Sequence, residues 1–340
     1  MSGATYSRIV DVAVHLPNEG LSTSAVEERI AAANPEFEVL RGVIQKVSGV
    51  AYRHIAPEGW MPSDLAVVAA RKLLAAVGYG AHQLDLIIFA AVGGDTLEPA
   101  TAHIVADKLD AKCPVFDLKN GCNAVMNAIE VADALIRAGT YQRVLIAYGE
   151  MPSRALRWRF RDTREFLEHS VVFVASDAGA ALLLEASPEP GVLRHWFSAK
   201  SDAWPLMTIP YVRLDDGRQA LGVPQVKPFE ILTALNAIDT GPLFPTAPIG
   251  SKPECGHWDE VVVVCVHQAT LQDFDILCSR LGIPAEKLVP TIADHGNLQA
   301  ATLPVQLAQA VETGRVQRGD TVVLMGVAAG LSYGFVVLKW

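Results

Sequence analysis

An internal repeat constrains the fold of this chain more than any other feature of its sequence. Residues 121–139 and 296–314 each begin and end with glycine, carry a helical apolar pattern between the two glycines, and are followed three residues later by Gln-Arg. Both segments then continue into a β-branched run that leads to a further glycine. We interpret them as a duplicated βα unit, in which Cys122 and Asn297 occupy equivalent positions at the start of a helix.

Strand-like and helix-like runs alternate along the whole chain. Continuous or alternating β-branched runs predict strands at residues 8–15, 86–92, 115–117, 144–148, 171–175, 180–185, 261–266, 321–325 and 332–339. Helical periodicity predicts helices at residues 23–33, 63–77, 100–109, 122–138, 229–239, 271–281 and 300–313. The alternation is typical of an α/β layered fold. The Pro- and Gly-rich run at 187–191 marks a seam between two predicted halves, 1–186 and 187–340.

The composition narrows the class of protein further. Of the 340 residues, 51% are hydrophobic and 19% are charged, which allows a large buried core and leaves little room for disorder. The net charge of −9 argues against nucleic-acid binding, because phosphate recognition needs a basic face. The longest apolar runs fall far short of the roughly 20 residues of a membrane span, and the first residues lack the features of a signal peptide. We expect a cytoplasmic globular protein that binds neither nucleic acid nor membrane.

Cys122 is the strongest candidate for a chemically active residue. A thiol at this position feels the positive end of the helix dipole and free backbone N–H groups, which lower the thiol pKa and favour the thiolate. The preceding glycine allows the sharp strand-to-helix turn of a nucleophile elbow. No Cys-x-x-Cys pair is present, which argues against a metal site or a disulfide framework. We interpret the other cysteines as buried small hydrophobic residues: Cys113, Cys255, Cys265 and Cys278.

Three sequence motifs surround the candidate residues. Residues 115–124 read Val-Phe-Asp-Leu-Lys-Asn-Gly-Cys-Asn-Ala, residues 266–270 read Val-His-Gln-Ala-Thr, and residues 295–302 read His-Gly-Asn-Leu-Gln-Ala-Ala-Thr. The first resembles the cysteine segment of the β-ketoacyl-acyl-carrier-protein synthase III enzymes of the thiolase-like superfamily. The others are close to that family's His-Gln-Ala-Asn and Tyr-Gly-Asn-Thr-Ser-Ala-Ala-Ser, and residues 326–335 parallel its glycine-rich closing hairpin. The resemblance implies a duplicated thiolase-like five-layer αβαβα fold, usually a homodimer, with an acyl thioester as substrate and no further cofactor.

The resemblance also implies a role for each member of a Cys–His–Asn set. Cys122 would be the nucleophile that accepts an acyl group, and its backbone N–H with that of Ala329 would form the oxyanion hole. His267 and Asn297 would hydrogen-bond the second substrate and stabilise the enolate that forms as a malonyl group loses carbon dioxide. Two simpler interpretations stay open, namely His267 as a structural histidine and Asn297 as a helix N-cap. His295, where the family commonly has tyrosine, is predicted to line the pocket wall.

The sequence departs from the family where the family binds coenzyme A. Aligned on Ser-Gly-Val at residues 48–50, Val43 and Val47 stand at the positions of the family's clamping tryptophan and arginine. Neither valine can stack on an adenine ring. We therefore expect the acyl donor to be a carrier-protein thioester rather than free coenzyme A.

Four charged residues are candidate contacts for the substrate or its carrier protein. Arg154, Arg157 and Arg161 belong to an arginine-rich stretch. The stretch is either a solvated face paired with nearby acidic residues or a landing patch for an acidic carrier protein. Glu98 stands where the family places an apolar side chain that reaches the partner subunit's acyl tunnel. Because a carboxylate in an apolar tunnel is costly, either Glu98 points elsewhere or the acyl group is polar.

Three functions stay open on the sequence alone. The favoured one is decarboxylative Claisen condensation of a Cys122-bound acyl group with a malonyl or β-ketoacyl thioester, in polyketide, other specialised or fatty-acid biosynthesis. The second is acyl transfer from Cys122 to a hydroxyl or amine, with His267 as general base. The third is a non-catalytic partner of another ketosynthase. The intact Cys–His–Asn set favours the first.

Overall fold

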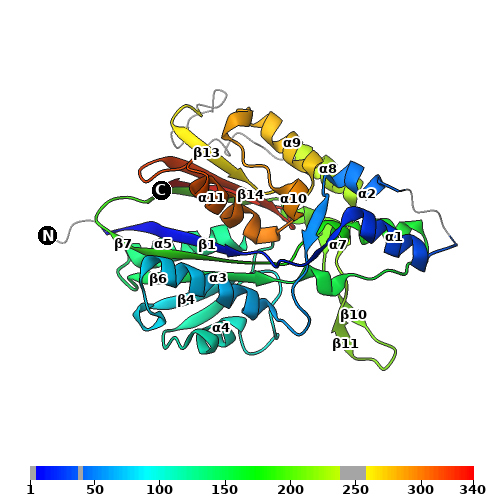
Figure 1. The fold of residues 1–340 in the computed structure, drawn as a ribbon, viewed down its shortest axis with the longest axis horizontal. Coiled ribbons are helices and arrows are strands. Elements are labelled where there is room, and N and C mark those ends of the chain that lie inside the picture. Colours follow the sequence, from blue (N-terminus) through cyan, green and yellow to red (C-terminus); the bar gives the residue numbers. More distant parts are fainter. Residues whose placement is uncertain (1–4, 37–40, 238–257) are drawn as a thin grey trace.

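The computed structural model describes residues 5–36, 41–237 and 258–340, and these are organised around two main sheets (Figure 1). The first sheet has the strand order β1 (Tyr6–His15), β7 (Ala178–Ser187), β6 (Arg143–Glu150), β4 (Leu86–Ala90) and β5 (Val115–Leu118). Strand β7 is antiparallel to both β1 and β6, whereas β6, β4 and β5 are parallel to one another.

The second sheet repeats this arrangement. Its order is β8 (Val192–Ala199), β15 (Ser332–Lys339), β14 (Thr321–Ala328) and β13 (Val261–Val266). Strand β15 is antiparallel to both β8 and β14, and β13 is parallel to β14. In the second sheet, a parallel bridge between Val264 and Leu288 occupies the position that β5 has in the first sheet. The matching strand order and directions confirm the duplication that the sequence predicts.

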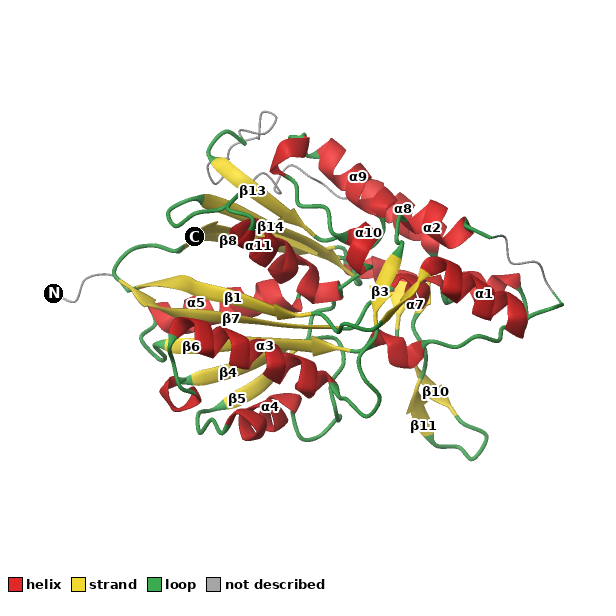
Figure 2. Ribbon diagram, viewed as in Figure 1, coloured by secondary structure: helices red, strands yellow, loops and turns green. Residues whose placement is uncertain are grey.

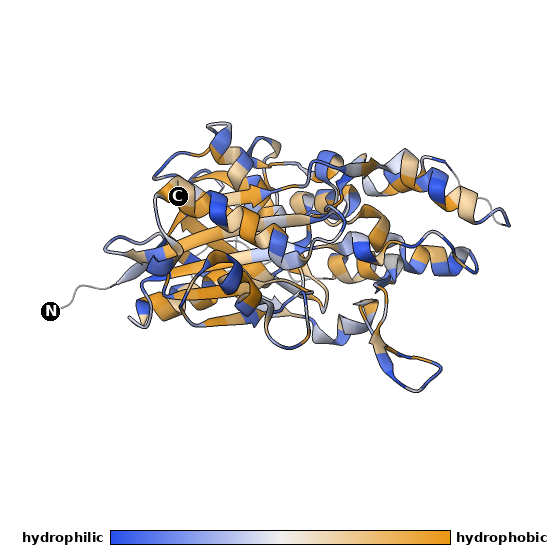
Figure 3. Ribbon diagram, turned by 60° about the horizontal axis from the view of Figure 1, so that its bottom comes forward, coloured by the Kyte–Doolittle hydropathy of each residue, from blue (hydrophilic) through white to orange (hydrophobic). Residues whose placement is uncertain are grey.

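Helices form three layers around the two sheets (Figure 2). The outer helices of the first sheet are α3 (Pro62–Val77) and α4 (Thr101–Leu109), and those of the second sheet are α8 (Pro228–Asn236) and α9 (Leu271–Arg280). Between the sheets lie α5 (Ala124–Arg137) and α11 (Thr302–Glu312). The strands are largely hydrophobic (Figure 3) because helices cover both faces of each sheet. This is the expected αβαβα thiolase-like fold.

Shorter elements complete the fold beyond the strand ends. They are β2 (Gly20–Ser22), α1 (Thr23–Ala33), α2 (Val43–Ser48), β3 (Tyr52–His54), α6 (Thr163–Glu168), α7 (Ser170–Val174), β9 (Met207–Thr208), β10 (Tyr211–Arg213), β11 (Gln219–Leu221), β12 (Gln225–Val226) and α10 (Ile292–His295). The hairpin of β10 and β11 projects from the body of the molecule (Figure 1).

The two central helices end as the repeat predicts. Gly139 follows α5 with a φ of 74°, and Gly314 follows α11 with a φ of 72°. This is the left-handed conformation that glycine adopts without a side-chain clash. Helix α5 begins at Ala124, two residues later than predicted, so Cys122 lies in the turn before the helix rather than in its first turn.

The predicted strand at residues 171–175 is wrong, because these residues form most of α7. A short, fully apolar run fits a buried helix as well as a buried strand, and periodicity cannot separate the two. Strand β8 was not predicted, since polar residues interrupt its pattern at the edge of the second sheet. The predicted helix at 229–239 corresponds to α8. Residues 238 and 239 and Cys255 lie outside the described residues.

Candidate active site

One cavity of about 380 Å³ collects the predicted Cys–His–Asn set. Cys122 lies in the turn between β5 and α5, His267 directly follows β13, and Asn297 follows α10. Ala329, in the turn between β14 and β15, lines the same cavity. Because the first sheet leads to Cys122 and the second to the other three residues, the site is complete only when the two sheets are packed together.

The remaining wall of the cavity is mostly apolar. Helices α2, α6, α7, α8 and α9 supply aliphatic side chains, among them Val47, Leu167, Val174, Leu235 and Ile276. Val43 also lines the cavity, so both valines at the family's clamp positions face this space. The charged lining residues Asp273 and Arg280 are held by neighbours: Thr270 donates to Asp273 Oδ2 at 2.7 Å, and Arg280 donates to the carbonyl of Leu235 at 2.6 Å.

Hydrogen bonding and close packing fix the turn that carries Cys122. Asn123 Nδ2 donates to the carbonyl oxygen of Ser332 at 2.9 Å, which ties the turn to the start of β15. Gly121 has a φ of 56°, and a Cβ added there would lie 3.7 Å from Ala329 N. The turn therefore runs beside Ala329, and the backbone N–H groups of Cys122 and Ala329 belong to neighbouring segments, as an oxyanion hole requires.

The thiol of Cys122 is not the activated thiolate that its position in the sequence predicts. Burial raises its pKa to about 12, and the nearby Glu150 carboxylate acts in the same direction. Desolvation of the buried sulfur outweighs the backbone hydrogen bond that lowers the pKa. At neutral pH the resting side chain is therefore a thiol, and it needs a base to become a nucleophile.

His267 is a buried, neutral imidazole. Its backbone N–H donates to the carbonyl of Met325 at 2.9 Å, which sets its place at the end of β13 beside β14. Burial lowers its pKa to about 4, so the ring is uncharged at neutral pH. Its Nδ1 has no hydrogen-bond partner among the described residues. A neutral ring can accept a proton at one nitrogen and donate from the other.

Hydrogen bonds to three backbone groups help to hold Asn297 at the cavity. Its N–H donates to the carbonyl of Val174 at 2.8 Å, and its own carbonyl accepts from the N–H of Ser176 at 2.9 Å. The side-chain Oδ1 accepts from the N–H of Gln299 at 2.9 Å. This is an Asx-type turn and not the helix N-cap of the simpler interpretation, because Leu298 is the N-cap of the helical turn at Gln299–Ala301. That bond uses the oxygen and leaves Nδ2 as the donor available to a ligand in the cavity.

Three polar residues beside this set were not predicted as functional. Tyr148 Oη approaches Glu150 Oε2 at 3.2 Å and Gln299 Oε1 at 3.3 Å. A signal for Glu150 exists in the repeat, since Glu150 and Val327 follow the equivalent glycines. An acidic residue where the repeat has an aliphatic one, at the end of a strand beside a nucleophile, indicates a local need for a carboxyl group.

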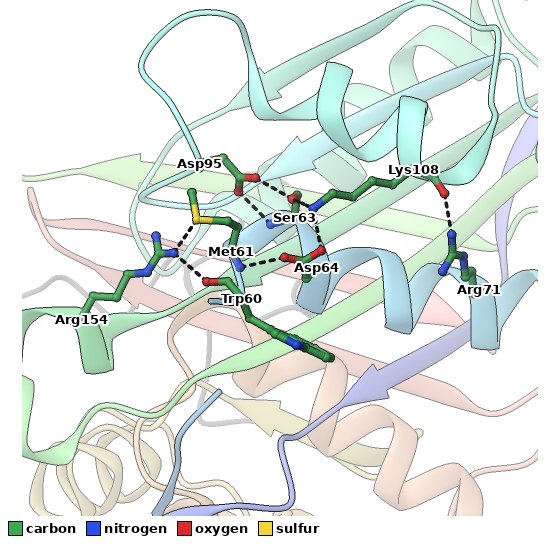
Figure 4. A network of polar contacts seen from close by, with 8 residues as sticks. All are labelled: Trp60, Met61, Ser63, Asp64, Arg71, Asp95, Lys108 and Arg154. Atoms are coloured by element: carbon green, nitrogen blue, oxygen red, sulfur yellow. Dashed lines mark hydrogen bonds and ion pairs between the residues drawn. The ribbon is translucent and has the colours of Figure 1, made fainter. Parts of the chain in front are cut away.

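The three predicted arginines lie outside the cavity. Arg154 binds the chain before α3: its Nη2 donates to the carbonyl of Trp60 at 2.8 Å and approaches Met61 Sδ at 2.7 Å (Figure 4). Arg157 and Arg161 both pair with Glu165, at 2.8 and 3.4 Å. Glu165 is therefore one of the nearby acidic partners that a solvated, ion-paired face would have. A carrier-binding role for the arginines stays a prediction.

Glu98 and His295 are also not brought to the cavity. Glu98 is exposed in the loop before α4, and its position relative to a partner subunit's tunnel stays a prediction. The prediction that His295 lines the pocket wall is wrong. Its Nδ1 lies 3.0 Å from Nε2 of His54, and the two rings stack with centroids 5.2 Å apart.

Two kinds of feature are absent from the described part of the chain. None of its helices is long and apolar enough to cross a membrane. Within the same residues, no group of three or more His, Cys, Asp or Glu side chains is arranged to hold a metal ion.

Comparison with known proteins relates this chain to condensing enzymes. Residues 116–202 match the model for 3-oxoacyl-[acyl-carrier-protein] synthase III, and residues 256–340 match the model for the C-terminal part of that enzyme. The synthase III of Aquifex aeolicus is 25% identical with a TM-score of 0.80, over 98% of this chain and all of that one. The Thermus thermophilus synthase III is 26% identical with a TM-score of 0.80, over 98% and 99%. An OleA variant from Xanthomonas campestris has the same fold, at 22% identity and a TM-score of 0.84, over 98% and 99%.

Proposed function

Since this chain belongs to the 3-oxoacyl-[acyl-carrier-protein] synthase III family, we propose that it is an acyltransferase that catalyses decarboxylative Claisen condensation. An acyl group is loaded on Cys122 and then joined to a malonyl thioester, whose carboxylate is lost as carbon dioxide. The observation that carries the proposal is the convergence of Cys122, His267 and Asn297 on one cavity.

Loading begins with a neutral thiol and a neutral imidazole. As Cys122 Sγ attacks the thioester carbonyl, the thiol proton passes to His267, because a thiol with a pKa of about 12 is a poor nucleophile without a base. The backbone N–H groups of Cys122 and Ala329 stabilise the negative oxygen of the tetrahedral intermediate. The intermediate then expels the donor's thiolate, which takes the proton back from His267 and leaves as a thiol.

Condensation uses His267 and Asn297 as hydrogen-bond donors. The malonyl carboxylate leaves as carbon dioxide, and its bonding electrons form an enolate whose oxygen accepts from the neutral imidazole N–H and from Asn297 Nδ2. The enolate carbon attacks the acyl carbonyl on Cys122. Collapse of the tetrahedral intermediate releases the β-keto product and the Cys122 thiolate, which is then reprotonated.

The acyl group is proposed to be an apolar chain. Apolar side chains from five helices supply most of the cavity wall, and a polar acyl group would find few partners there. The Xanthomonas campestris OleA structure of the same fold contains lauric acid and lauroyl-CoA. Each methylene buried in such a wall contributes about 0.8 kcal/mol, so we expect loading efficiency to rise about fourfold per carbon until the cavity is full.

The donor is proposed to be an acyl carrier protein. Val43 and Val47 give an adenine ring no stacking partner at the cavity. Helix α6 places Phe166 and Leu167 in the cavity wall, while the side chains of Arg161 and Arg164 are 84% and 88% exposed at the same helix. This exposed pair suits an acidic carrier whose pantetheine arm enters beside α6.

A homodimer is proposed as the working assembly. Strand β5 ends the first sheet and pairs only with β4 among the described strands. In the loop that precedes α4, Leu97 is 87% exposed next to Glu98. An open strand edge and an exposed apolar side chain on neighbouring segments suit the surface of a second subunit.

Intact-protein mass spectrometry tests the function. After incubation with acyl thioesters of two to sixteen carbons on carrier protein and on coenzyme A, the wild type should gain an acyl adduct. Cys122→Ala should gain none, and the control Cys113→Ala should label normally. Adding a malonyl thioester should then release carbon dioxide. Release of the acyl group as an ester or amide without carbon dioxide would establish the second function. If the folded protein gains no adduct, the third function, a non-catalytic partner of another ketosynthase, becomes the better hypothesis.

A further inference from the structure

The hydroxyl of Tyr148 has more acceptors than it can serve. Tyr148 is fully buried on β6, and its Oη lies 3.1 Å from the carbonyl oxygen of Leu298, 3.2 Å from Glu150 Oε2 and 3.3 Å from Gln299 Oε1. A tyrosine carries one hydrogen, and the carbonyl and amide oxygens carry none. Among these groups only the carboxyl of Glu150 can supply a second hydrogen. The contact set is therefore best satisfied when Glu150 is protonated and donates to Tyr148.

Gln299 connects Tyr148 to Asn297. Its Nε2 donates to the Asn297 carbonyl at 3.2 Å, which leaves Oε1 toward Tyr148, and the reverse orientation would set two acceptors against each other. Its backbone N–H donates to Asn297 Oδ1 at 2.9 Å. Gln299 has a φ of 49°, a left-handed conformation that costs energy for any residue other than glycine. Such strain persists where the surroundings hold the residue in place, as the contacts to Tyr148 and Asn297 do here.

We propose that Glu150, Tyr148 and Gln299 are positioning residues that keep the Asn297 carboxamide aimed into the cavity. The neutral carboxyl of Glu150 donates to Tyr148, and the Tyr148 hydrogen is shared between the Leu298 carbonyl and Gln299 Oε1. Gln299 in turn donates to the carbonyl oxygen and to Oδ1 of Asn297. Asn297 Nδ2 is then directed at the enolate. This inference rests on the proposed function, because it assigns these three residues to the condensation step.

The chain of donors reverses when Glu150 ionises. Burial raises the pKa of Glu150 to about 7, while Tyr148, Gly93 and the positive charge of Lys119 lower it. The Cys122 thiol and the Asp177 carboxyl are the other titratable groups that act on Tyr148. Above pH 7 the carboxylate can only accept, so the Tyr148 hydrogen turns toward it and away from Gln299. We therefore expect condensation to slow above pH 7 while acyl loading is much less affected.

Tyr148→Phe and two Glu150 variants test the inference. Tyr148→Phe and Glu150→Leu should slow carbon dioxide release from the acyl-loaded enzyme about tenfold, since each removes one link of the chain. Loading measured by mass should stay within twofold. Glu150→Gln copies the neutral carboxyl, with Oε1 toward the N–H of Gly93 and an amide N–H toward Tyr148, so it should restore the rate and abolish the decline above pH 7.

The chain offers a matched control at a distance from the site. Tyr79, just after α3, donates to Glu185 Oε2 on β7 at 3.1 Å and forms a second tyrosine–glutamate pair, so Tyr79→Phe and Glu185→Gln should leave both half-reactions unchanged. A normal rate in Tyr148→Phe, or a Glu150→Gln variant as slow as Glu150→Leu, would overturn the inference while normal loading preserves the proposed function. A wild type that never loads would instead contradict the proposed function itself.

Discussion

The Cys122 thiol gives the most direct test of the site at the scale of one residue. Because burial and Glu150 raise its pKa to about 12, the thiolate is a minor species throughout the accessible pH range. We predict that alkylation of Cys122 by iodoacetamide accelerates about tenfold per pH unit from pH 7 to 10 without levelling off. Mass spectrometry with Cys122→Ala as the blank would measure it. Levelling near pH 7 would show the activated thiolate that the sequence pattern predicts.

His267 makes a second prediction at this scale. Burial lowers its pKa to about 4, so kcat/KM should stay level from pH 6.5 to 5 and fall tenfold per unit only below pH 4. An acid limb near 6.5, the ordinary value of histidine, would contradict a buried neutral ring. The lowered pKa of His267 also makes the free energy of unfolding depend on pH. The unfolded ring takes up a proton below pH 6.5 and the folded ring does not, so this contribution to stability is lost as the pH falls from 6.5 toward 4.

Sequence alone could predict which residues converge but not their charge states. The motifs place Cys122 and Asn297 ahead of helices and His267 at a strand end, and the structure brings all three to one cavity. Their pKa values depend on burial, which helices distant in sequence provide. The contact between Tyr148 and Gln299 joins residues 151 positions apart, and no local pattern predicts such a hydrogen bond.

At the scale of an element, two glycines test the packing of helix α2, which supplies Val43 and Val47 to the cavity. A substitution at one glycine adds backbone strain alone, and a substitution at the other adds a packing clash as well. Gly42 and Gly49 flank this helix with φ values of 77° and 79°. A Cβ on Gly42 meets nothing within 4 Å, whereas one on Gly49 would lie 2.6 Å from Leu271 Cβ at the start of α9.

We predict that Gly42→Ala lowers the free energy of unfolding by about 1 kcal/mol, from the left-handed backbone alone. Gly49→Ala should lower it by about 3 kcal/mol, because a clash with α9 is added. Urea denaturation of the two variants measures the difference. Equal losses would mean that α2 and α9 do not pack tightly at this point.

The sequence of helix α7 does not by itself determine its secondary structure. Its run of Val and Phe residues predicts a strand, yet it folds as a helix of five residues between α6 and the chain that leads to β7. The strands of both sheets were predicted more successfully where helices bury them on two sides, since continuous apolar runs are typical of such strands. Strand β8 was not predicted, because its position at the edge of the sheet leaves several residues half-buried and its sequence is therefore not a continuous apolar run.

The duplication divides the chemistry between two similar parts of the whole molecule. The first sheet leads to Cys122, and the second leads to His267, Asn297 and Ala329. Helices α5 and α11, the two copies of the repeated helix, both follow turns that carry a cavity residue. The equivalence of Cys122 and Asn297 therefore has a functional consequence: one copy of the βα unit presents a sulfur and the other an amide at the same cavity.

The open edge of β5 makes a prediction about the assembly. Ile87 and Ala91 donate to the carbonyls of Pro114 and Leu118, so alternate residues of β5 face β4, and Val115 turns its N–H toward the free edge. If a second copy pairs there, the protein should sediment at twice 36.5 kDa. Val115→Pro removes only the outward N–H and should yield monomers, as should Leu97→Arg.

The hairpin offers a control for these two variants. Leu221 is 65% exposed on β11, so Leu221→Arg adds the same charge to another exposed leucine and should leave the sedimentation coefficient of the dimer unchanged. Dimers that persist in both Val115→Pro and Leu97→Arg would place the interface away from β5. In a true β5 dimer, mixing Leu97→Arg with excess wild type should yield few mixed dimers, because the charge would then sit against an apolar partner surface.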